Sequence, residues 1–307
     1  MELDDFETAF SRLRVNTART SSPHKPCMLL AVIDLAEAGA LTTNAIRYLP
    51  NLLERYEAYF DIVRIEADHP NPFLPFFHLR SDGFWKLVPI AGREAQLQAM
   101  RTARSHADIQ ENIDHVELDA DLYRYLRDAR ARAALRGALI TRWFPQKATD
   151  LRRAVAAHLE EDQYELQLRE GAPPPYTVTP RVGQAAFRNV VLQAYDYRCA
   201  ATGWRLIVPG AWALIDAAHL IPYAESQNND PRNGMALTPT FHRALDQNLI
   251  APGPDMKWHV SRVVERRIPD NRPLVELDQQ DVIFHGDQKY RPSPTSLEWR
   301  VENLRQE

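Results

Sequence analysis

The spacing of apolar residues predicts that the first half of the chain is mostly helical. Residues 26–39, PCMLLAVIDLAEAG, carry apolar side chains at helical spacing, begin with a proline and reach a natural stop at Gly39. Proline is common in the first turn of a helix, and glycine is common directly after its last residue. Further helical patterns cover residues 51–66, about 120–138 and about 147–169.

Two short apolar runs in the same half alternate as strands do. FFHLR at 76–80 and FWKLV at 84–88 are separated by SDG, which is typical of a tight turn. The pattern predicts a small β-hairpin. On such a strand His78 and Arg80 would share one face, which makes them a candidate functional pair.

A proline-rich segment separates the two halves. REGAPPPYTVTP, residues 169–180, contains three consecutive prolines, which end a helix and stiffen the chain into an extended spacer. We therefore predict two domains with a linker between them and a tail after them. The predicted ranges are 1–168 for the first domain, 169–183 for the linker, 184–285 for the second domain and 286–307 for the tail.

The second half has a mixed pattern. A helical run after the linker is followed by two strand candidates, RLIV at 205–208 and WALIDAAHL at 212–220. A polar loop, a short helix near 240–246 and a closing hairpin at 248–261 complete the pattern. The chain as a whole is predicted to be an α+β protein, with a mostly helical first domain that contains a small hairpin.

Composition agrees with a globular protein of this kind. A length of 307 residues suits two domains, and 45% hydrophobic with 25% charged residues allows a buried core in each. The two cysteines, Cys27 and Cys199, lack CxxC spacing and support neither a disulfide framework nor a cysteine-bound zinc. No run approaches the roughly 18 apolar residues that span a bilayer, and no signal peptide is evident. We expect a cytoplasmic protein without a membrane partner.

The net charge of −4 conceals a basic segment. Residues 124–153 contain nine basic and two acidic side chains, a local charge of +7. Such a segment is a candidate surface for DNA phosphates. A solvated helix face rich in arginine explains it equally well.

A histidine constellation lies in DAAHLIPYAESQNNDPRNGMALTPTFHRALD, residues 216–246. His219 precedes Asn233 by 14 positions, and His242 follows nine positions later. Asp246 lies one helical turn after His242, so both side chains reach one cation from a single helix face. Phosphodiester hydrolysis needs a base to activate water and a Lewis acid to carry the developing charge. These residues supply both.

This segment resembles the HNH nucleases, which have the ββα-metal fold. The resemblance implies that His219 is the general base, that Asn233 holds the loop and orients His219, and that His242 binds a divalent ion, Mg²⁺ or Mn²⁺. Many members carry a metal-binding carboxylate directly before the first histidine, where this chain has Ala218. Asp216 and Asp246 are the available substitutes. We expect no structural zinc, because the paired CxxC motifs are missing, and expect Cys199 to be a small buried residue.

The first half resembles the sulfur-binding domain of McrA-like, modification-dependent restriction enzymes. The resemblance rests on SSPHKPCMLLAVIDLAEAG and HPNPFLPFFHLRSDGFWKLVP. It implies a reader of DNA in which sulfur replaces a non-bridging phosphate oxygen, through a shallow apolar cup rimmed by cationic donors. The candidate DNA-binding residues are His24, Lys25, Asn71, Pro72, Phe73, His78 and Arg80. As core strands, the aromatic residues would instead pack inside.

We predict a modification-dependent, type IV-like restriction endonuclease that acts on phosphorothioate-modified duplex DNA as a homodimer. Two other functions fit the same pattern. A reader of methylated or hydroxymethylated cytosine would need a deep aromatic cage for a flipped base. A catalytically silent DNA-binding module would have no need to combine His219, Asn233 and His242.

Overall fold

The computed structural model describes residues 1–15, 22–65, 68–171, 180–206 and 214–306. Contacts between residues divide the chain into two compact units, Met1–Asp162 and Gln163–Glu307. The division falls inside one long helix, α9 (Ala148–Glu170), somewhat before the predicted linker. Residues 172–179, which form most of that linker, lie outside the described residues.

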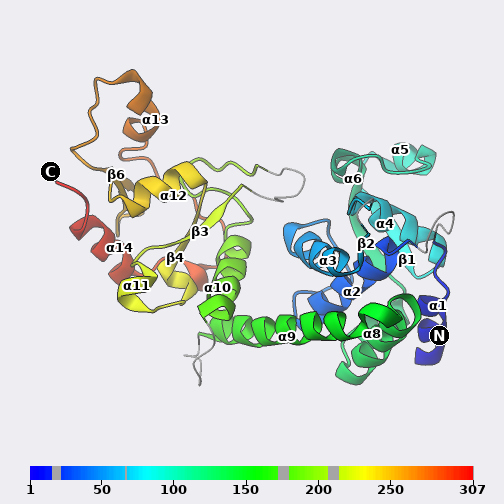
Figure 1. Ribbon diagram of the computed structural model, residues 1–307. Helices are drawn as coiled ribbons and strands as arrows, with labels where there is room; N and C mark the ends of the chain where they lie inside the picture. The colour runs from blue at the N-terminus through cyan, green and yellow to red at the C-terminus, as the bar shows by residue number, and fades with distance from the viewer. Residues whose placement is uncertain (16–21, 66–67, 172–179, 207–213, 307) are drawn as a thin grey trace. The chain divides into compact units, whose positions relative to one another are not determined.

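The first unit is built around α2 (His24–Glu37). Most of its side chains are buried, as expected of a helix that is apolar on nearly all sides and enclosed by others. It packs against α3 (Pro50–Val63) and α8 (Ala129–Trp143), which flank it in Figure 1. The remaining elements of the unit are α1 (Leu3–Ser11), α4 (Phe73–His78), η1 (Leu79–Asp82), β1 (Trp85–Pro89), α5 (Glu94–Ala99), α6 (His106–Asn112), β2 (Ile113–Leu118), α7 (Ala120–Leu126) and η2 (Pro145–Lys147).

The prediction of a hairpin from FFHLR and FWKLV is wrong. FFHLR lies in α4 and η1, and β1 pairs antiparallel with β2, with Trp85 opposite Leu118. Phe76 and Phe77 are adjacent and both fully buried, which an alternating strand with one solvent face does not allow but a short enclosed helix does. His78 and Arg80 therefore do not share a strand face.

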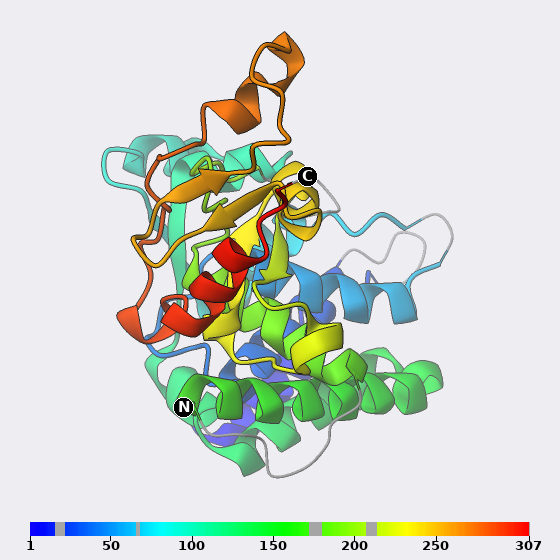
Figure 2. The same cartoon turned by 90° about the vertical axis from the view of Figure 1, so that its left-hand side faces the viewer.

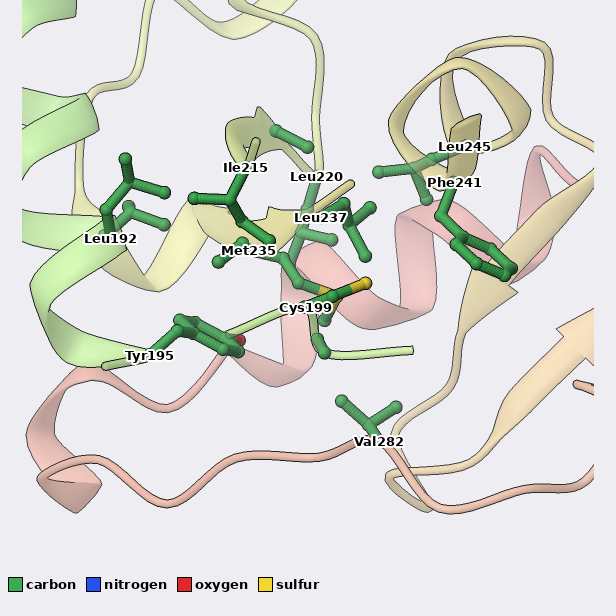
Figure 3. Packing of buried hydrophobic residues seen from close by; sticks show 14 of the residues in the cluster. Leu192, Tyr195, Cys199, Ile215, Leu220, Met235, Leu237, Phe241, Leu245 and Val282 are labelled. Carbon is green, nitrogen blue, oxygen red and sulfur yellow. The ribbon is translucent and has the colours of Figure 1, made fainter. Parts of the chain in front are cut away.

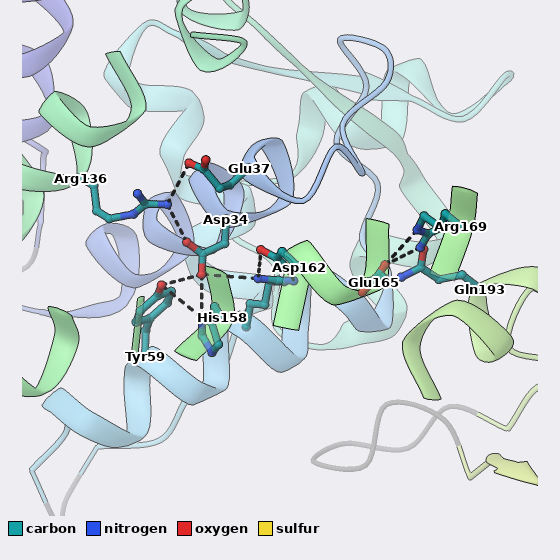
Figure 4. A network of polar contacts seen from close by, with 10 residues as sticks. Asp34, Glu37, Tyr59, Arg136, His158, Asp162, Glu165, Arg169 and Gln193 are labelled. Carbon is teal, nitrogen blue, oxygen red and sulfur yellow. Dashed lines mark hydrogen bonds and ion pairs between the residues drawn. The ribbon is translucent and has the colours of Figure 1, made fainter. Parts of the chain in front are cut away.

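The basic segment 124–153 is not one continuous phosphate-facing surface. Arg132 and Arg136 of α8 are each 8% exposed. Arg132 forms a two-pronged ion pair with Glu37. Figure 4 shows Arg136, whose Nη2 lies 3.0 Å from Oδ1 of Asp34. Asp34 also accepts hydrogen bonds from Tyr59 and His158. These arginines stabilise the core of the first unit.

The second unit contains the ββα arrangement that the resemblance implies. β3 (Asp216–His219) pairs antiparallel with β4 (Gly234–Leu237), and α12 (Pro239–Asp246) follows after one residue. The α+β fold class is thus confirmed. The other elements of this unit are α10 (Pro180–Ala194), α11 (Tyr223–Ser226), η3 (Pro231–Asn233), β5 (Ile250–Pro252), β6 (Trp258–Val260), η4 (Pro269–Asn271), α13 (Arg272–Val275), η5 (Gln288–Tyr290) and α14 (Pro294–Glu302).

One apolar cluster holds these elements together. Side chains from α10, the β3–β4 hairpin and α12 converge around Cys199, which is fully buried as predicted (Figure 3). Its sulfur accepts a hydrogen bond from the amide of Thr238 at 3.4 Å. The hairpin predicted at 248–261 is present as β5 and β6. Of the strand candidate at 205–208, residues 207 and 208 lie outside the described residues.

The segment 286–307, predicted to be a tail, contains a packed helix. α14 runs beside the β5–β6 hairpin, as Figure 2 shows. Its Ser293 cap accepts a hydrogen bond from the amide of Ser296, and Leu297 and Arg300 are buried. This helix is part of the packed second unit.

Arg136 provides a test of the buried ion pairs. Replacing Arg136 with Ala leaves the Asp34 carboxylate with one cation fewer in the core, so we expect a loss of about 3 kcal/mol in the free energy of unfolding. Urea denaturation of the full chain, followed by circular dichroism, measures it. Arg130→Ala, an exposed change on the same helix, is the control, and equal stability of the two variants would contradict a structural role for Arg136.

Candidate active site and reader surface

The β3–β4 hairpin places His219 against α10. His219 is the last residue of β3 and lies opposite Gly234. Its ring stacks on Phe187 of α10, with centroids 3.8 Å apart and planes 7° from parallel. Gly234 permits this close approach, because a Cβ there would lie 2.4 Å from Val191 and 2.7 Å from Phe187. The strand, the helix and the stacking partner together fix the imidazole.

The environment of His219 favours the neutral imidazole. Burial is the largest effect and lowers the pKa of His219 below its ordinary value. The hydrogen bond with Asn229 opposes it, the nearby His242 lowers the pKa further, and Asp246 raises it slightly. Nε2 of His219 lies 3.2 Å from Oδ1 of Asn229. An amide oxygen only accepts hydrogen bonds, so Nε2 carries the proton and Nδ1 keeps its lone pair. A neutral imidazole with a free lone pair is the form that a general base requires.

Asn233 is 1% exposed and binds the loop that follows His219. Its Oδ1 accepts from the amide of Ile221 at 2.8 Å, and its Nδ2 donates to the carbonyl oxygens of Ile221 and Asn228. The predicted loop-holding contacts are therefore present. The amide that touches the imidazole of His219 belongs to Asn229, which the sequence reasoning did not single out.

His242 lies between two carboxylates. Its Nδ1 is 3.1 Å from Oδ2 of Asp216 on β3, and its Nε2 is 3.5 Å from Oδ2 of Asp246, one turn further along α12. Asp216 and Asp246 are about half exposed, whereas Ala218, where many HNH nucleases carry a carboxylate, is fully buried. Both substitutes predicted from the sequence thus contact His242.

These side chains have the chemistry that a divalent ion requires. Carboxylate oxygens suit Mg²⁺ or Mn²⁺, an imidazole nitrogen is a common ligand of divalent transition metals, and a ligating histidine commonly donates its other N–H to a carboxylate. Here Nδ1 of His242 donates to Asp216, and Nε2 of His242 lies next to the carboxylate of Asp246. The described part of the chain shows no preformed group of three or more His, Cys, Asp or Glu side chains that could hold a metal ion.

Arg300 of α14 is a further residue that sequence reasoning missed. Its guanidinium donates to the main-chain oxygen of His219 at 2.9 Å and to that of Leu245 at 3.0 Å. It is 81 positions from His219, and no local motif marks it. The only sequence signal is an arginine among apolar residues in a helical segment.

Two candidate residues of the reader domain are engaged in contacts within it. Lys25, 7% exposed, donates to Asp82 at 2.6 Å and to Ser81 at 3.1 Å, which ties α2 to η1. His24 lies against Phe60, donates from Nε2 to the carbonyl of His69 at 2.9 Å, and has a pKa lowered chiefly by burial.

The remaining candidates lie on α4 and its ends. Asn71 has a φ of +31° and its carbonyl accepts from the amide of Leu74, which forms the turn into the helix. Pro72 is buried, and the partly exposed Phe73 packs edge-on against His106 with centroids 5.2 Å apart. Of these residues, Phe73 offers the most apolar surface.

His78 and Arg80 lie close to Lys25. Burial lowers the pKa of His78, and Lys25 and Arg80 lower it further through their charge. Arg80 is exposed, stacks over Phe77 at 3.9 Å and donates to the carbonyl of Met100. An open cleft beside Arg80 is lined in part by Trp85, Leu87, Leu97 and Lys86. This end of α4 therefore combines cationic groups with apolar surface.

Comparison with protein families assigns both halves. The model of the ScoMcrA-like DNA sulfur-binding domain matches residues 4–157, half of the chain. The chain belongs to this family. The model of an HNH endonuclease family matches residues 199–251, which contain β3, β4 and α12. The protein thus combines a DNA sulfur-binding domain with an HNH endonuclease domain, as both resemblances imply.

Two solved structures are similar to parts of the chain. The sulfur-binding domain of SprMcrA complexed with phosphorothioated DNA is 20% identical, with a TM-score of 0.37, over 47% of this chain and 86% of that one. The modification-dependent TagI restriction endonuclease is 14% identical, with a TM-score of 0.32, over 45% and 42% respectively. At these scores the assignment rests on the family models. No curated protein sequence matches the chain.

Phe187 provides a test of the neutral base. Phe187→Leu uncovers one face of His219, so its pKa should rise towards about 6.5. The acidic limb of the kcat/KM profile would then move to higher pH, while the rate at pH 8 changes little. Nuclear magnetic resonance titration of His219 measures the shift directly.

Phe284→Leu is the matched control, because Phe284 packs against Tyr195 in the same domain. It should leave the titration of His219 unchanged. If both variants titrate like the wild type, burial by Phe187 does not set the pKa.

Proposed function

We propose that this protein is a modification-dependent restriction endonuclease that binds phosphorothioate-modified duplex DNA and hydrolyses its phosphodiester bonds. The observation that carries the proposal is a half-buried imidazole with a lowered pKa, His219, beside the carboxylate-flanked His242. This pair lies in an HNH domain, on the same chain as a DNA sulfur-binding domain.

In the proposed reaction, Nδ1 of His219 takes a proton from a water molecule that attacks the scissile phosphorus. Asn229 holds the tautomer, and Phe187 holds the plane of the ring. His242 and Asp246, with Asp216 as a further candidate, would bind the divalent ion that HNH nucleases generally use. When bound, such an ion stabilises negative charge on the phosphate and on the leaving oxygen. In this proposal, His219 transfers the proton, and the residues that bind the ion serve to stabilise charge.

The reader domain supplies the preference for sulfur in this proposal. Sulfur is larger and more weakly hydrated than oxygen, so apolar surface beside a cation favours a phosphorothioate over a phosphate. Phe73 and the cleft next to Arg80 supply apolar surface. Arg80 and His78 supply the donors, and Lys25, which is buried and bound to Asp82 and Ser81, holds η1 beside them.

We further propose that the protein acts as a homodimer in the cytoplasm. Two copies with one active site each could cut both strands of a duplex together, and symmetric dimers are the commonest oligomers. Both cysteines are free and buried, which suits a reducing compartment. Among the described residues, no helix has the length and apolar character to cross a membrane.

His219→Ala tests the catalytic proposal. Loss of the base should reduce cleavage of phosphorothioated DNA by about 100- to 10,000-fold. Binding to the same DNA should be nearly unchanged, because the reader domain is untouched. Plasmid cleavage and gel-shift assays measure the two effects.

EDTA should also stop cleavage by the wild-type protein, and added Mg²⁺ or Mn²⁺ should restore it. Persistent cutting by His219→Ala would remove this histidine as the base. Full activity in EDTA would reject the role of the ion.

Arg80→Ala tests the reader proposal. Gel shifts with phosphorothioated, cytosine-methylated and plain duplexes of one sequence should show a preference of the wild-type protein for the first. Loss of one charged donor should reduce that preference by about 10-fold. Arg47→Ala, an exposed change elsewhere in the same domain, is the control. Equal wild-type affinity for all three duplexes would refute sulfur recognition, and preference for the methylated one would favour a modified-base reader.

A further inference from the structure

The helix α14 places one buried arginine against both elements that carry the candidate catalytic residues. Arg300 is 1% exposed. Its Nη2 donates to the main-chain oxygen of His219 at 2.9 Å, at the end of β3. Its Nη1 donates to the oxygen of Leu245 at 3.0 Å, in the last turn of α12, and to Oδ1 of Asn248 at 2.9 Å. One planar group thus joins β3 to α12.

Burying the guanidinium of Arg300 costs free energy in two ways, so its role is more than to fill space in the core. Burial lowers the pKa of Arg300 to about 10, partly offset by the charges of Asp246 and Glu225, so it stays protonated at neutral pH. Its Nε is buried without an acceptor among the described residues. An apolar side chain of similar volume would avoid both costs. What the guanidinium adds is a rigid fork with donors in a fixed plane.

The two main-chain carbonyl groups that accept hydrogen bonds from Arg300 show which parts of the candidate site this side chain holds. The carbonyl of His219 belongs to the residue with the candidate base. The carbonyl of Leu245 is an end group of α12, which also accepts a hydrogen bond from the amide of Asn248 at 2.9 Å and favours a cation. Asp246, the next residue, faces His242 on the same helix. A shift of Arg300 therefore changes the separation between the base and the carboxylate–imidazole pair.

We propose that Arg300 is a positioning residue for phosphodiester hydrolysis, because it holds the main chain of His219 and the end of α12 on one guanidinium. The proposal rests on the proposed nuclease function. Arg300 acts through the residues that it orients and touches no reacting atom. Misplacement of a catalytic group by about 1 Å, or loss of an outer contact, lowers activity by about 10- to 100-fold.

Variants of Arg300 separate positioning from general stability. Arg300→Gln removes the charge and one arm of the fork, and Arg300→Lys keeps the charge without the planar fork. Arg291→Ala, an exposed arginine change in the same segment, is the matched control. Each full-length protein is assayed with phosphorothioated DNA, 10 degrees below the lowest unfolding midpoint, which keeps all variants folded.

We expect kcat of Arg300→Gln to fall by about 10- to 100-fold, while KM and the gel-shift affinity stay within about twofold, because ground-state binding is unchanged. Arg300→Lys should recover part of the rate. Arg291→Ala should cleave like the wild type. If Arg300→Gln does not fold, the kcat and KM of Arg300→Lys decide the same question.

An activity-independent measurement distinguishes the two proposals. Nitrogen-15 spectra of the imidazoles should show altered signals of His219 in Arg300→Gln and none in Arg291→Ala. If folded Arg300 variants cleave at the wild-type rate with unchanged His219 signals, the positioning role is overturned and the nuclease stands. If the wild-type protein does not cleave, the proposed function fails, and altered His219 signals still support the structural part of this inference.

Discussion

The candidate active site depends on the stacking of His219 on Phe187. This contact places an ionisable ring in an apolar environment, and burial keeps it neutral. A charged imidazole cannot accept a proton, and in open solvent the same ring would have a higher pKa, so less of it would be in the neutral form at slightly acidic pH. The β3–β4 hairpin, the loop fixed by Asn233 and the fork of Arg300 all keep this ring in place.

The carboxylate–imidazole side of the site has a different physical character. His242, Asp216 and Asp246 are partly exposed and linked to one another by ion-pair distances. A strongly hydrated cation exchanges water readily only where its ligands remain accessible. A half-buried base and an open ligand set therefore lie on neighbouring elements, which suits a substrate as large as a DNA backbone.

The sequence predicted the local parts of this architecture and missed the distant ones. His219, Asn233 and His242 could be singled out from the sequence, because the hairpin and the short helix that carry them follow one another in the chain and leave a recognisable spacing. Asn229 and Arg300 were not, because their roles follow from packing. In the reader domain, Phe76 and Phe77 fitted a strand equally well until the enclosing helices were known. Arg132 and Arg136 looked like surface charge, because a buried partner such as Asp34 is not visible in a charge count.

Gly234 shows how little freedom this site allows. Its φ of −127° is open to every amino acid except proline, so conformation does not demand glycine there. The lack of space demands glycine, because side chains of α10 leave no room for a Cβ atom at this position. Any side chain at this position, however small, forces Val191 or Phe187 of α10 to shift. The geometry of a phosphodiester-cutting site can thus be lost through a residue that bears no functional group.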